Sequence, residues 1–289
     1  MSPKRKHTAA CVVDTECTYI SNNPRMVYHF GACFGDIEES DQMRNPIKMD
    51  YYVKEVIEDL GNFLHQNKDG QNYAYNPNMA RVWKDAINNP TKVKSWKHII
   101  EEWQDLITSM GVDYLTSYNF NFDIGQGDKI GTIRKTHQQL TDKTFYLPRN
   151  VEYFCLMDIA GTLLLNRDFN RWVKGLDDDQ IKQVTTEKGN LSYSAETVAR
   201  FINKDLWYTE QHTALRDSLL EFGLLCHFWA KWKHIIKSEF VNNVNGVSWK
   251  RIADGYTATE KRKLRKGVKA KTRGKKFPIA PELNLQGGK

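Results

Sequence analysis

Short apolar runs and longer segments with apolar residues at helical spacing alternate along this chain. Ala9 to Val13 is an apolar run of strand length that ends at Asp14, as expected of a buried strand. Met26 to Phe34 is rich in β-branched and aromatic residues, and Asn22-Asn23-Pro24 supplies a turn before it. The pattern therefore predicts a β-hairpin in this first part of the chain.

Helical spacing of apolar residues recurs in later segments. The clearest case is Ser95 to Met110, whose apolar residues form one stripe and which Gly111 can close. The same criterion predicts three more helices, over Tyr51–Leu64, Ser194–Ile202 and His212–Ile236. Two further apolar runs predict buried strands, over Val112–Ser117 and Val151–Met157.

The order of these elements predicts the fold class. Strands come first as a hairpin and then alternate with helices, which is typical of an α/β domain with a mixed central β-sheet flanked by helices. We expect this domain to span residues 8–240, with residues 65–94 as an insertion within it. Residues 241–289 are expected to form a basic, partly disordered C-terminal extension.

The positive charge of the chain is concentrated in that extension. Twelve Lys or Arg residues lie between Lys250 and Lys276 against two acidic residues, a local net charge of +10, whereas the whole 289-residue chain carries +7. The rest of the chain is therefore mildly acidic. Such a basic block commonly binds phosphate, and a solvated tail without a specific partner is the alternative.

Cysteine content and hydropathy narrow the cellular setting. The five cysteines show no Cys-x-x-Cys spacing, which argues against a disulfide framework or zinc cluster and favours a cytoplasmic location, in a host cell if the chain is phage- or virus-encoded. No apolar run approaches the roughly 20 residues of a membrane span, so we expect no membrane association. Pro3-Lys4-Arg5-Lys6 resembles a short nuclear address, which leaves a nuclear location open.

Two carboxylates, Asp14 and Glu16, follow the first apolar run. Side chains alternate along an extended chain, so these two point to the same side. Carboxylates at the end of a buried strand would repel one another unless a cation compensates them, and hard oxygen ligands suit Mg²⁺ or Mn²⁺. The same spacing at Asp36-Ile37-Glu38 lies in a polar stretch that is typical of a loop.

A third carboxylate, Asp123, follows the predicted strand Val112–Ser117 and can reach the same sheet edge. A helix cap is its alternative role. Asn119, four residues earlier, is a plausible hydrogen-bonding group near the site, and a turn residue is the alternative.

The last candidate residues, His212 and Asp217, open the last predicted helix. Ala214 lies between them, and its small side chain would let the helix approach the sheet closely. His137 and Asp142 have the same separation, but no packing helix follows them. The pair at 212 and 217 is therefore the better candidate.

Taken in order, these residues resemble the DnaQ-like exonuclease superfamily in its DEDDh branch. Its three motifs match as Asp14-Thr15-Glu16, Tyr118-Asn119-Phe120-Asn121-Phe122-Asp123 and His212-Thr213-Ala214-Leu215-Arg216-Asp217. The last is the His-x-Ala-x-x-Asp pattern of the family, and Leu156-Met157-Asp158 also resembles a family segment. The resemblance covers about residues 8–235 and implies a ribonuclease-H-like exonuclease fold.

The resemblance also implies a reaction. Asp14, Glu16, Asp123 and Asp217 would hold two divalent metal ions, Mg²⁺ or Mn²⁺, about 3.5–4 Å apart, and His212 would be the general base toward the attacking water. The chain would then be a 3′–5′ exonuclease that releases nucleoside 5′-monophosphates from single-stranded or frayed 3′ ends of DNA or RNA.

Substrate contacts are less clearly marked in the sequence. Thr15 and Asn119, inside the motifs, are candidate substrate-binding residues. Trp83, Trp172 and Trp207 lie outside the clearest helical stripes and are candidates for stacking on bases, with core packing as the alternative. The sequence leaves open the preference between DNA and RNA and the oligomeric state.

Three other functions remain open at this point. One is a hydrolase for short oligonucleotides or dinucleotides, and another is a non-catalytic nucleic-acid-binding module on an exonuclease scaffold. The third is an interaction protein that is recruited through its basic tail and does not use the metal site. Metal-dependent activity and the preferred substrate length would distinguish them.

Overall fold

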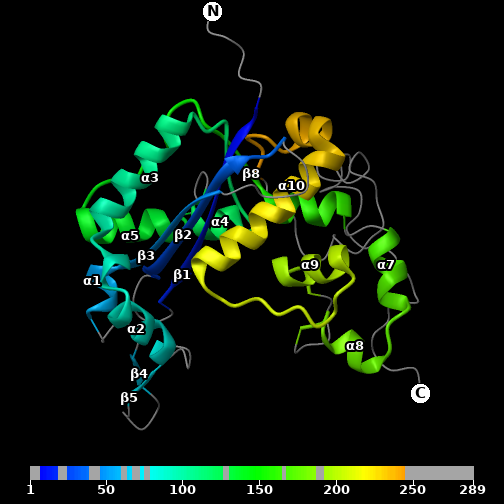
Figure 1. Cartoon of the computed structure of the whole chain (residues 1–289), viewed down its shortest axis with the longest axis horizontal. Helices are drawn as coiled ribbons and strands as arrows, with labels where there is room; N and C mark the ends of the chain where they lie inside the picture. Colours follow the sequence, from blue (N-terminus) through cyan, green and yellow to red (C-terminus); the bar gives the residue numbers. More distant parts are fainter. Residues whose placement is uncertain are drawn as a thin grey trace, which may run out of the picture. The chain divides into compact units, whose positions relative to one another are not determined.

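The computed structural model describes residues 7–18, 25–38, 46–59, 64–66, 72–74, 79–125, 130–164, 167–186 and 192–244. These residues form two compact units (Figure 1), one built from residues up to Phe154 together with Gln211–Val244, and the other from Cys155–Glu210. The turn Asn22-Asn23-Pro24 and the basic segment 245–289 lie outside the described residues, so the predictions made for them stay predictions.

The first unit is built on a six-stranded sheet of order β6-β3-β2-β1-β7-β8. Its strands are β1 (Ala9–Cys17), β2 (Val27–Asp36), β3 (Ile47–Val53), β6 (Val93–Lys94), β7 (Tyr114–Ser117) and β8 (Glu152–Cys155). The pairs β1–β2 and β2–β3 are antiparallel, whereas β1–β7 and β3–β6 are parallel. The sheet is therefore mixed, and the predicted α/β class is confirmed.

The predicted opening hairpin is confirmed, and its strands are longer than predicted. The antiparallel pairing of β1 with β2 runs from Ala9 opposite Asp36 to Glu16 opposite His29 and, after a shift of register, to Cys17 opposite Val27. Asp14 and Glu16 therefore lie inside β1 rather than after its end, and Asp36 belongs to a strand rather than a loop. The backbone pairs with the neighbouring strand whatever the side chains are, so a polar residue does not end a strand that has a partner.

The predicted helix over Tyr51–Leu64 is wrong. Tyr51 to Val53 belong to β3, and α1 (Lys54–Ile57) is a single turn. Tyr52 pairs with His29 of β2, so the free edge of the hairpin recruits this segment as a third strand. The apolar residues at helical spacing that follow serve only the short turn, and residues 60–63 lie outside the described part of the chain.

Helices cover both faces of the sheet (Figure 1). The helices of this unit beyond α1 are α2 (Met79–Asn88), α3 (Trp96–Met110), α4 (Phe120–Asp123), α5 (Thr132–Thr141) and α10 (Ala214–Glu239), with the 3₁₀ turn η2 (Pro90–Lys92). Phe30 packs edge-on against Trp96 and Trp103 of α3. The next residue, Gly31, faces α10. Because successive side chains in a strand point to opposite faces, α3 and α10 lie on opposite sides of the sheet.

The predicted helix Ser95–Met110 is confirmed as α3. The Ser95 side chain accepts a hydrogen bond from the backbone N–H of His98 at 3.3 Å, and Gly111 ends the helix in the left-handed conformation with φ of 55°. This pair of caps is what the sequence pattern of a polar start and a glycine end predicts.

The predicted strand Val151–Met157 is only partly right. β8 ends at Cys155, and Leu156–Ile159 form the short helix α6, whose four residues, Asp158 included, are all buried. A short apolar run bounded by polar residues fits a buried strand and a buried helical turn equally well.

The predicted insertion 65–94 contains α2, η2, β6 and β5 (Asn72–Ala74), and β5 pairs antiparallel with β4 (Leu64–Gln66), which begins one residue before the predicted insertion. The structure thus gives this region elements of its own. Whether it is an insertion within a domain spanning 8–240 stays a prediction.

The second unit is helical. It contains α6, the π-helical turn η3 (Ala160–Leu164), α7 (Arg167–Lys174), α8 (Asp178–Lys182) and α9 (Ala195–Asn203), of which α9 is the predicted helix Ser194–Ile202. Ring contacts between Phe169, Trp172 and Phe201 form its aromatic centre.

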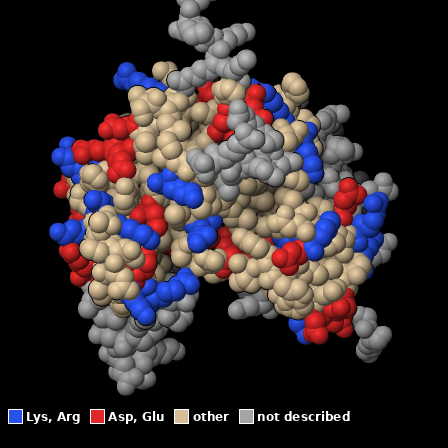
Figure 2. Space-filling model, in the orientation of Figure 1, with Lys and Arg blue, Asp and Glu red and all other residues tan. Residues whose placement is uncertain are grey.

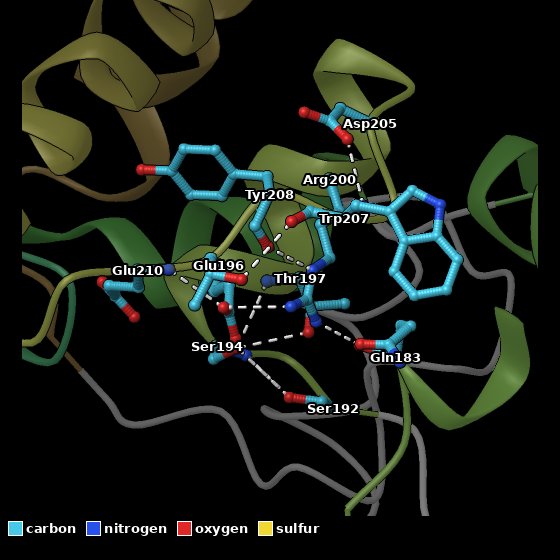
Figure 3. Close-up of polar contacts among 11 residues, drawn as sticks. Gln183, Ser192, Ser194, Glu196, Thr197, Arg200, Asp205, Trp207, Tyr208 and Glu210 are labelled. Carbon is cyan, nitrogen blue, oxygen red and sulfur yellow. Dashed lines mark hydrogen bonds and ion pairs between the residues drawn. The ribbon is translucent and has the colours of Figure 1, made fainter. Parts of the chain in front are cut away.

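A buried arginine organises the segment after α9 (Figure 3). The Arg200 Nε donates to the backbone O of Tyr208 at 2.8 Å, its Nη1 donates to the backbone O of Gln183, and its Nη2 lies 3.0 Å from Glu196 Oε1. Glu196 Oε1 also accepts from the backbone N–H of Glu210 at 3.0 Å. The charge of Arg200 is thus satisfied by one carboxylate and two carbonyls, as a buried guanidinium requires.

The described surface mixes both signs of charge. On the face drawn in Figure 2, Lys and Arg side chains are interspersed with Asp and Glu. Within the described part of the chain, no helix is both long enough and apolar enough to cross a lipid bilayer.

Candidate active site

A close contact between α10 and β2 brings the last motif against the first. A Cβ at Gly31 would lie 2.1 Å from the backbone carbonyl carbon of Ala214, so residue 31 must lack a side chain for the helix to pass at this distance. Ala214 is fully buried, which confirms the predicted close approach. Gly31 pairs with Asp14, and opposed residues share one face of the sheet, so Asp14 and Glu16 face α10.

Three of the four predicted ligands converge there. One carboxylate oxygen each from Asp14, Glu16 and Asp217 lie within 4.8 Å of one another, a grouping able to hold a metal ion. Asp217 is buried and the other two are half-buried. A strand and a helix about 200 residues apart in sequence thus supply one acidic group.

The fourth predicted ligand, Asp123, is not one of the three residues whose oxygens lie within 4.8 Å of one another, although its charge raises the pKa of Asp14. It ends α4, a single helical turn after β7, and is only 3% exposed. The Thr15 hydroxyl donates to Asp123 Oδ1 at 2.6 Å, and the Thr132 hydroxyl lies 2.8 Å from that of Thr15. Thr15, predicted as a substrate contact, therefore holds a candidate ligand in place, and its contact with substrate stays a prediction.

The charges of the cluster oppose its ionisation. Burial raises the pKa of Asp14 well above its ordinary value, and the neighbouring charges of Glu221, Asp123, Glu16 and Asp217 raise it further. Carboxylates packed in this way cannot all ionise at neutral pH without a compensating cation. A divalent cation with oxygen ligands is the group that this site fits.

The pKa values of Asp123 and Glu16 are also raised by burial, and nearby groups oppose the rise at each residue. Burial raises the pKa of Asp123 to about 7, against the opposing effect of the hydrogen bond from Thr15. Burial also raises the pKa of Glu16, and the nearby charges of His29, His212 and Arg81 act in the opposite direction.

Glu221 is a fifth carboxylate that the sequence motifs do not contain. It lies one helical turn after Asp217 in α10, is 3% exposed, and accepts a hydrogen bond from the backbone N–H of Tyr118 at 2.9 Å. Among the neighbouring charges, its own has the largest effect on the pKa of Asp14. The spacing of four residues from Asp217 on one helix was the available signal.

The predicted general base lies just outside α10, contrary to the predicted helix His212–Ile236. The helix begins at Ala214, with Thr213 as its N-cap, and His212 precedes it with φ of 49°. This left-handed conformation is uncommon for a residue with a side chain. The imidazole is exposed and lies near enough to Glu16 to lower the pKa of that carboxyl.

Asn119 and the three tryptophans were the other residues predicted to contact substrate, and they differ in burial and in hydrogen bonding. The backbone carbonyl of Asn119 accepts from Phe122 N at 2.8 Å and from Asp123 N at 3.1 Å, which starts the turn that carries Asp123. Trp83 is half-buried, Trp172 packs against aromatic residues, and Trp207 is 68% exposed. Trp207 is therefore the most accessible of the three stacking candidates.

The two motif-like pairs elsewhere in the chain contain residues that bind partners outside the acidic group. Asp36 Oδ1 accepts from the backbone N–H of Glu38 at 2.9 Å, and Glu38 forms an ion pair with Lys233 at 2.5 Å. His137 lies in α5, where its Nδ1 accepts from Trp96 Nε1 at 3.4 Å. Neither pair belongs to the acidic group.

Comparison with known proteins gives a distant likeness. No protein-family model matches the chain, and no curated protein matches its sequence. A full-length 3′-exonuclease is 11% identical with a TM-score of 0.46, over 78% of this chain and 82% of that one. E. coli exonuclease I in complex with a dT13 oligonucleotide is 14% identical with a TM-score of 0.44, over 80% of this chain and 43% of that one. A product-bound exonuclease I is 13% identical with a TM-score of 0.46, over 80% of this chain and 48% of that one.

Proposed function

We propose that this chain is a metal-dependent 3′–5′ exonuclease that hydrolyses single-stranded or frayed nucleic-acid 3′ ends. The convergence of Asp14, Glu16 and Asp217 within 4.8 Å carries the proposal. Like charges gathered at a buried position lower stability, and a cation would compensate them. The order of the three motifs, which resembles the DEDDh branch, favours attack at the 3′ end.

The residues present fit two divalent cations. Asp14, Glu16 and Asp217 would hold one, and Asp14 with Asp123 would hold the other. When bound, Mg²⁺ or Mn²⁺ would supply Lewis-acid activation of the scissile phosphate and of the attacking water.

His212 is the group proposed to move a proton. It is exposed beside Glu16, so a water molecule approaching the acidic group can meet its imidazole. His212 takes the proton of water as the water oxygen bonds to phosphorus and the P–O3′ bond breaks. The 3′ oxygen leaves with the shortened strand and gains a proton, and the product is a nucleoside 5′-monophosphate. An imidazole suits this step because its ordinary pKa lies near neutrality.

The test is degradation of single-stranded DNA and RNA labelled at either the 3′ or the 5′ end, with Mg²⁺, Mn²⁺ or EDTA. We expect metal-dependent loss that begins at the 3′ end, and the preferred polymer and length would identify the substrate. Asp14→Asn should abolish cleavage. Asp36→Asn, which alters the other Asp-x-Glu pair, is the matched control and should cleave normally.

His212→Ala tests the proposed base separately. Turnover at saturating substrate should fall by about 100-fold or more, with substrate affinity little changed. Unchanged turnover would remove His212 from the mechanism. The absence of cleavage of either polymer by folded wild-type protein with both metals would reject the proposed function.

A further inference from the structure

Arg81 reaches the candidate active site from α2, inside residues 65–94. Its Nη2 donates to the backbone O of Gln211 at 2.9 Å, a contact between positions 130 residues apart. Arg81 is thus bonded to the residue that precedes His212.

The backbone at His212 needs such support. A residue with a side chain at φ of 49° is held in a sparsely populated region, and it persists there only when its surroundings fix it. On one side, the Thr213 carbonyl accepts from Asp217 N at 2.9 Å, which joins it to the first turn of α10. On the other side, the Gln211 carbonyl is bonded to Arg81. Both neighbours of His212 are therefore fixed.

The helix that carries Arg81 is itself anchored one turn later. Asp85 accepts hydrogen bonds from Tyr52 Oη at 2.7 Å and from Asn89 Nδ2 at 2.9 Å, and Lys92 Nζ lies 3.2 Å from it. The apolar residues Val82 and Ala86 of the same helix are buried. Arg81 therefore extends from a fixed helix rather than from a loosely held surface element.

The hydrogen bonds and ion pairs around Asp85 continue to β3 and to β2, the strand next to β1. Lys92 Nζ also lies 2.8 Å from Asp50 Oδ2, and Asp50 Oδ1 lies 2.7 Å from His29 Nε2. His29 is buried and pairs with Glu16 across β1 and β2. Polar contacts thus connect α2 to the strand beside a candidate ligand.

We propose that Arg81 is a positioning residue for His212, and that delivering it is what the segment 65–94 contributes to the reaction. The guanidinium holds the Gln211 carbonyl and thereby fixes where the imidazole meets the attacking water. This proposal rests on the proposed function, in which His212 is the general base that Arg81 would position. A direct grip on substrate phosphate is the competing role, and it differs in which kinetic constant it changes.

The test is steady-state cleavage of a short labelled oligonucleotide by Arg81→Gln, Arg81→Lys and the control Lys84→Gln. Lys84 is an exposed residue of the same helix, so its substitution removes one positive charge without touching Gln211. Arg81→Gln should lower kcat by about 10- to 100-fold, the cost of a misplaced catalytic group, and change KM by less than about 3-fold. Arg81→Lys should recover part of the loss, and Lys84→Gln should match the wild type.

A double-mutant cycle identifies the residue through which Arg81 acts. In a His212→Ala background, adding Arg81→Gln should lower kcat by less than about 2-fold, because the positioned group is already gone. Full additivity of the two substitutions would overturn the proposal. So would a rise in KM with kcat unchanged, which would assign Arg81 to phosphate binding.

A second measurement separates this proposal from the proposed function. Amide hydrogen exchange of the full chain should be about 10-fold faster across residues 210–214 in Arg81→Gln than in Lys84→Gln, since one charge-assisted hydrogen bond is lost. Unchanged exchange there would overturn the positioning role whether or not the protein cleaves nucleic acid. If exchange is faster in Arg81→Gln as expected but the wild-type protein cleaves no nucleic acid, only the proposed function is overturned.

Discussion

Replacing Asp123 with Asn should stabilise the metal-free protein at alkaline pH. Asp123 is 3% exposed, and burial raises its pKa to about 7 from an ordinary value of 3.8. The charged form is therefore less favourable in the folded protein than in the unfolded chain. Asn removes the charge and keeps an acceptor for the Thr15 hydroxyl, which bonds Asp123 Oδ1 at 2.6 Å.

The sign and size of the effect follow from proton linkage. Between about pH 4 and pH 7 the folded protein binds more protons at Asp123 than the unfolded chain, so the free energy of unfolding falls as the pH rises. It is greatest below about pH 4 and levels off above about pH 7. One pKa unit corresponds to about 1.4 kcal/mol, so a rise of roughly three units sets a limit of about 4 kcal/mol at pH 8. Asp123→Asn should recover about 2–4 kcal/mol of this, or about 5–15 °C in Tm for a unit of this size.

The assay is urea unfolding of wild type and Asp123→Asn in EDTA at pH 5 and pH 8. The variant should gain stability mainly at pH 8. Mg²⁺ at about 100 times its Kd should add about 2.7 kcal/mol to the wild type and less to the variant, which has lost a candidate ligand. Asp36→Asn is the control, because its half-exposed carboxylate lies outside the cluster.

Two results would refute this reasoning. One is a variant no more stable than the wild type at pH 8 in EDTA. The other is a metal-free wild type whose unfolding free energy does not fall between pH 5 and pH 8. Either would mean that Asp123 ionises in the folded protein without the cost that its burial implies.

Three further changes test other parts of the structure. Gly31→Ala places a Cβ 2.1 Å from the Ala214 backbone, so α10 must shift, and urea unfolding should show a loss of about 3 kcal/mol together with weaker cleavage. Trp207→Ala should raise KM for single strands by about 5-fold or more if the exposed ring stacks on a base, while stability changes by less than about 0.5 kcal/mol. Deleting residues 250–289 should weaken binding to long strands and flatten its dependence on salt, while dinucleotide cleavage persists; equal salt slopes for both proteins would reject a phosphate-binding tail.

The sequence correctly predicted those elements whose apolar pattern and end signals all lie within the element's own residues. The helix Ser95–Met110 carries its apolar stripe and both caps locally, and the hairpin of β1 and β2 has an apolar run in each strand. The prediction failed at Tyr51–Leu64, where apolar spacing alone suggested a helix. The neighbouring edge of β2 decided the outcome there, and a partner strand distant in sequence is not visible in a local window.

The sequence identified residues of the candidate site, but it did not predict the contacts that bring them together. Asp14, Glu16 and Asp217 were found from their motifs, and the structure brings them together. Gly31 gave no sign that it would permit the approach of α10, because a glycine in a strand has several common causes. Arg81 was invisible for a related reason: its partner at Gln211 is a backbone carbonyl, which any residue provides.

Glu221 helps to fix the position of α10, the helix that carries Asp217. The same helix supplies the ligand candidate Asp217 and, one turn later, the carboxylate that bonds the Tyr118 backbone beyond β7. The next residue of α10, Phe222, packs closely against β2, because a Cβ added at Gly35 would lie 2.8 Å from its ring. With the helix fixed at these points, Asp217 cannot move away from Asp14 to relieve their repulsion, so the metal-free protein retains an unfavourable charge arrangement. A bound cation relieves it, and this difference between the two states favours metal binding without any rearrangement of the fold.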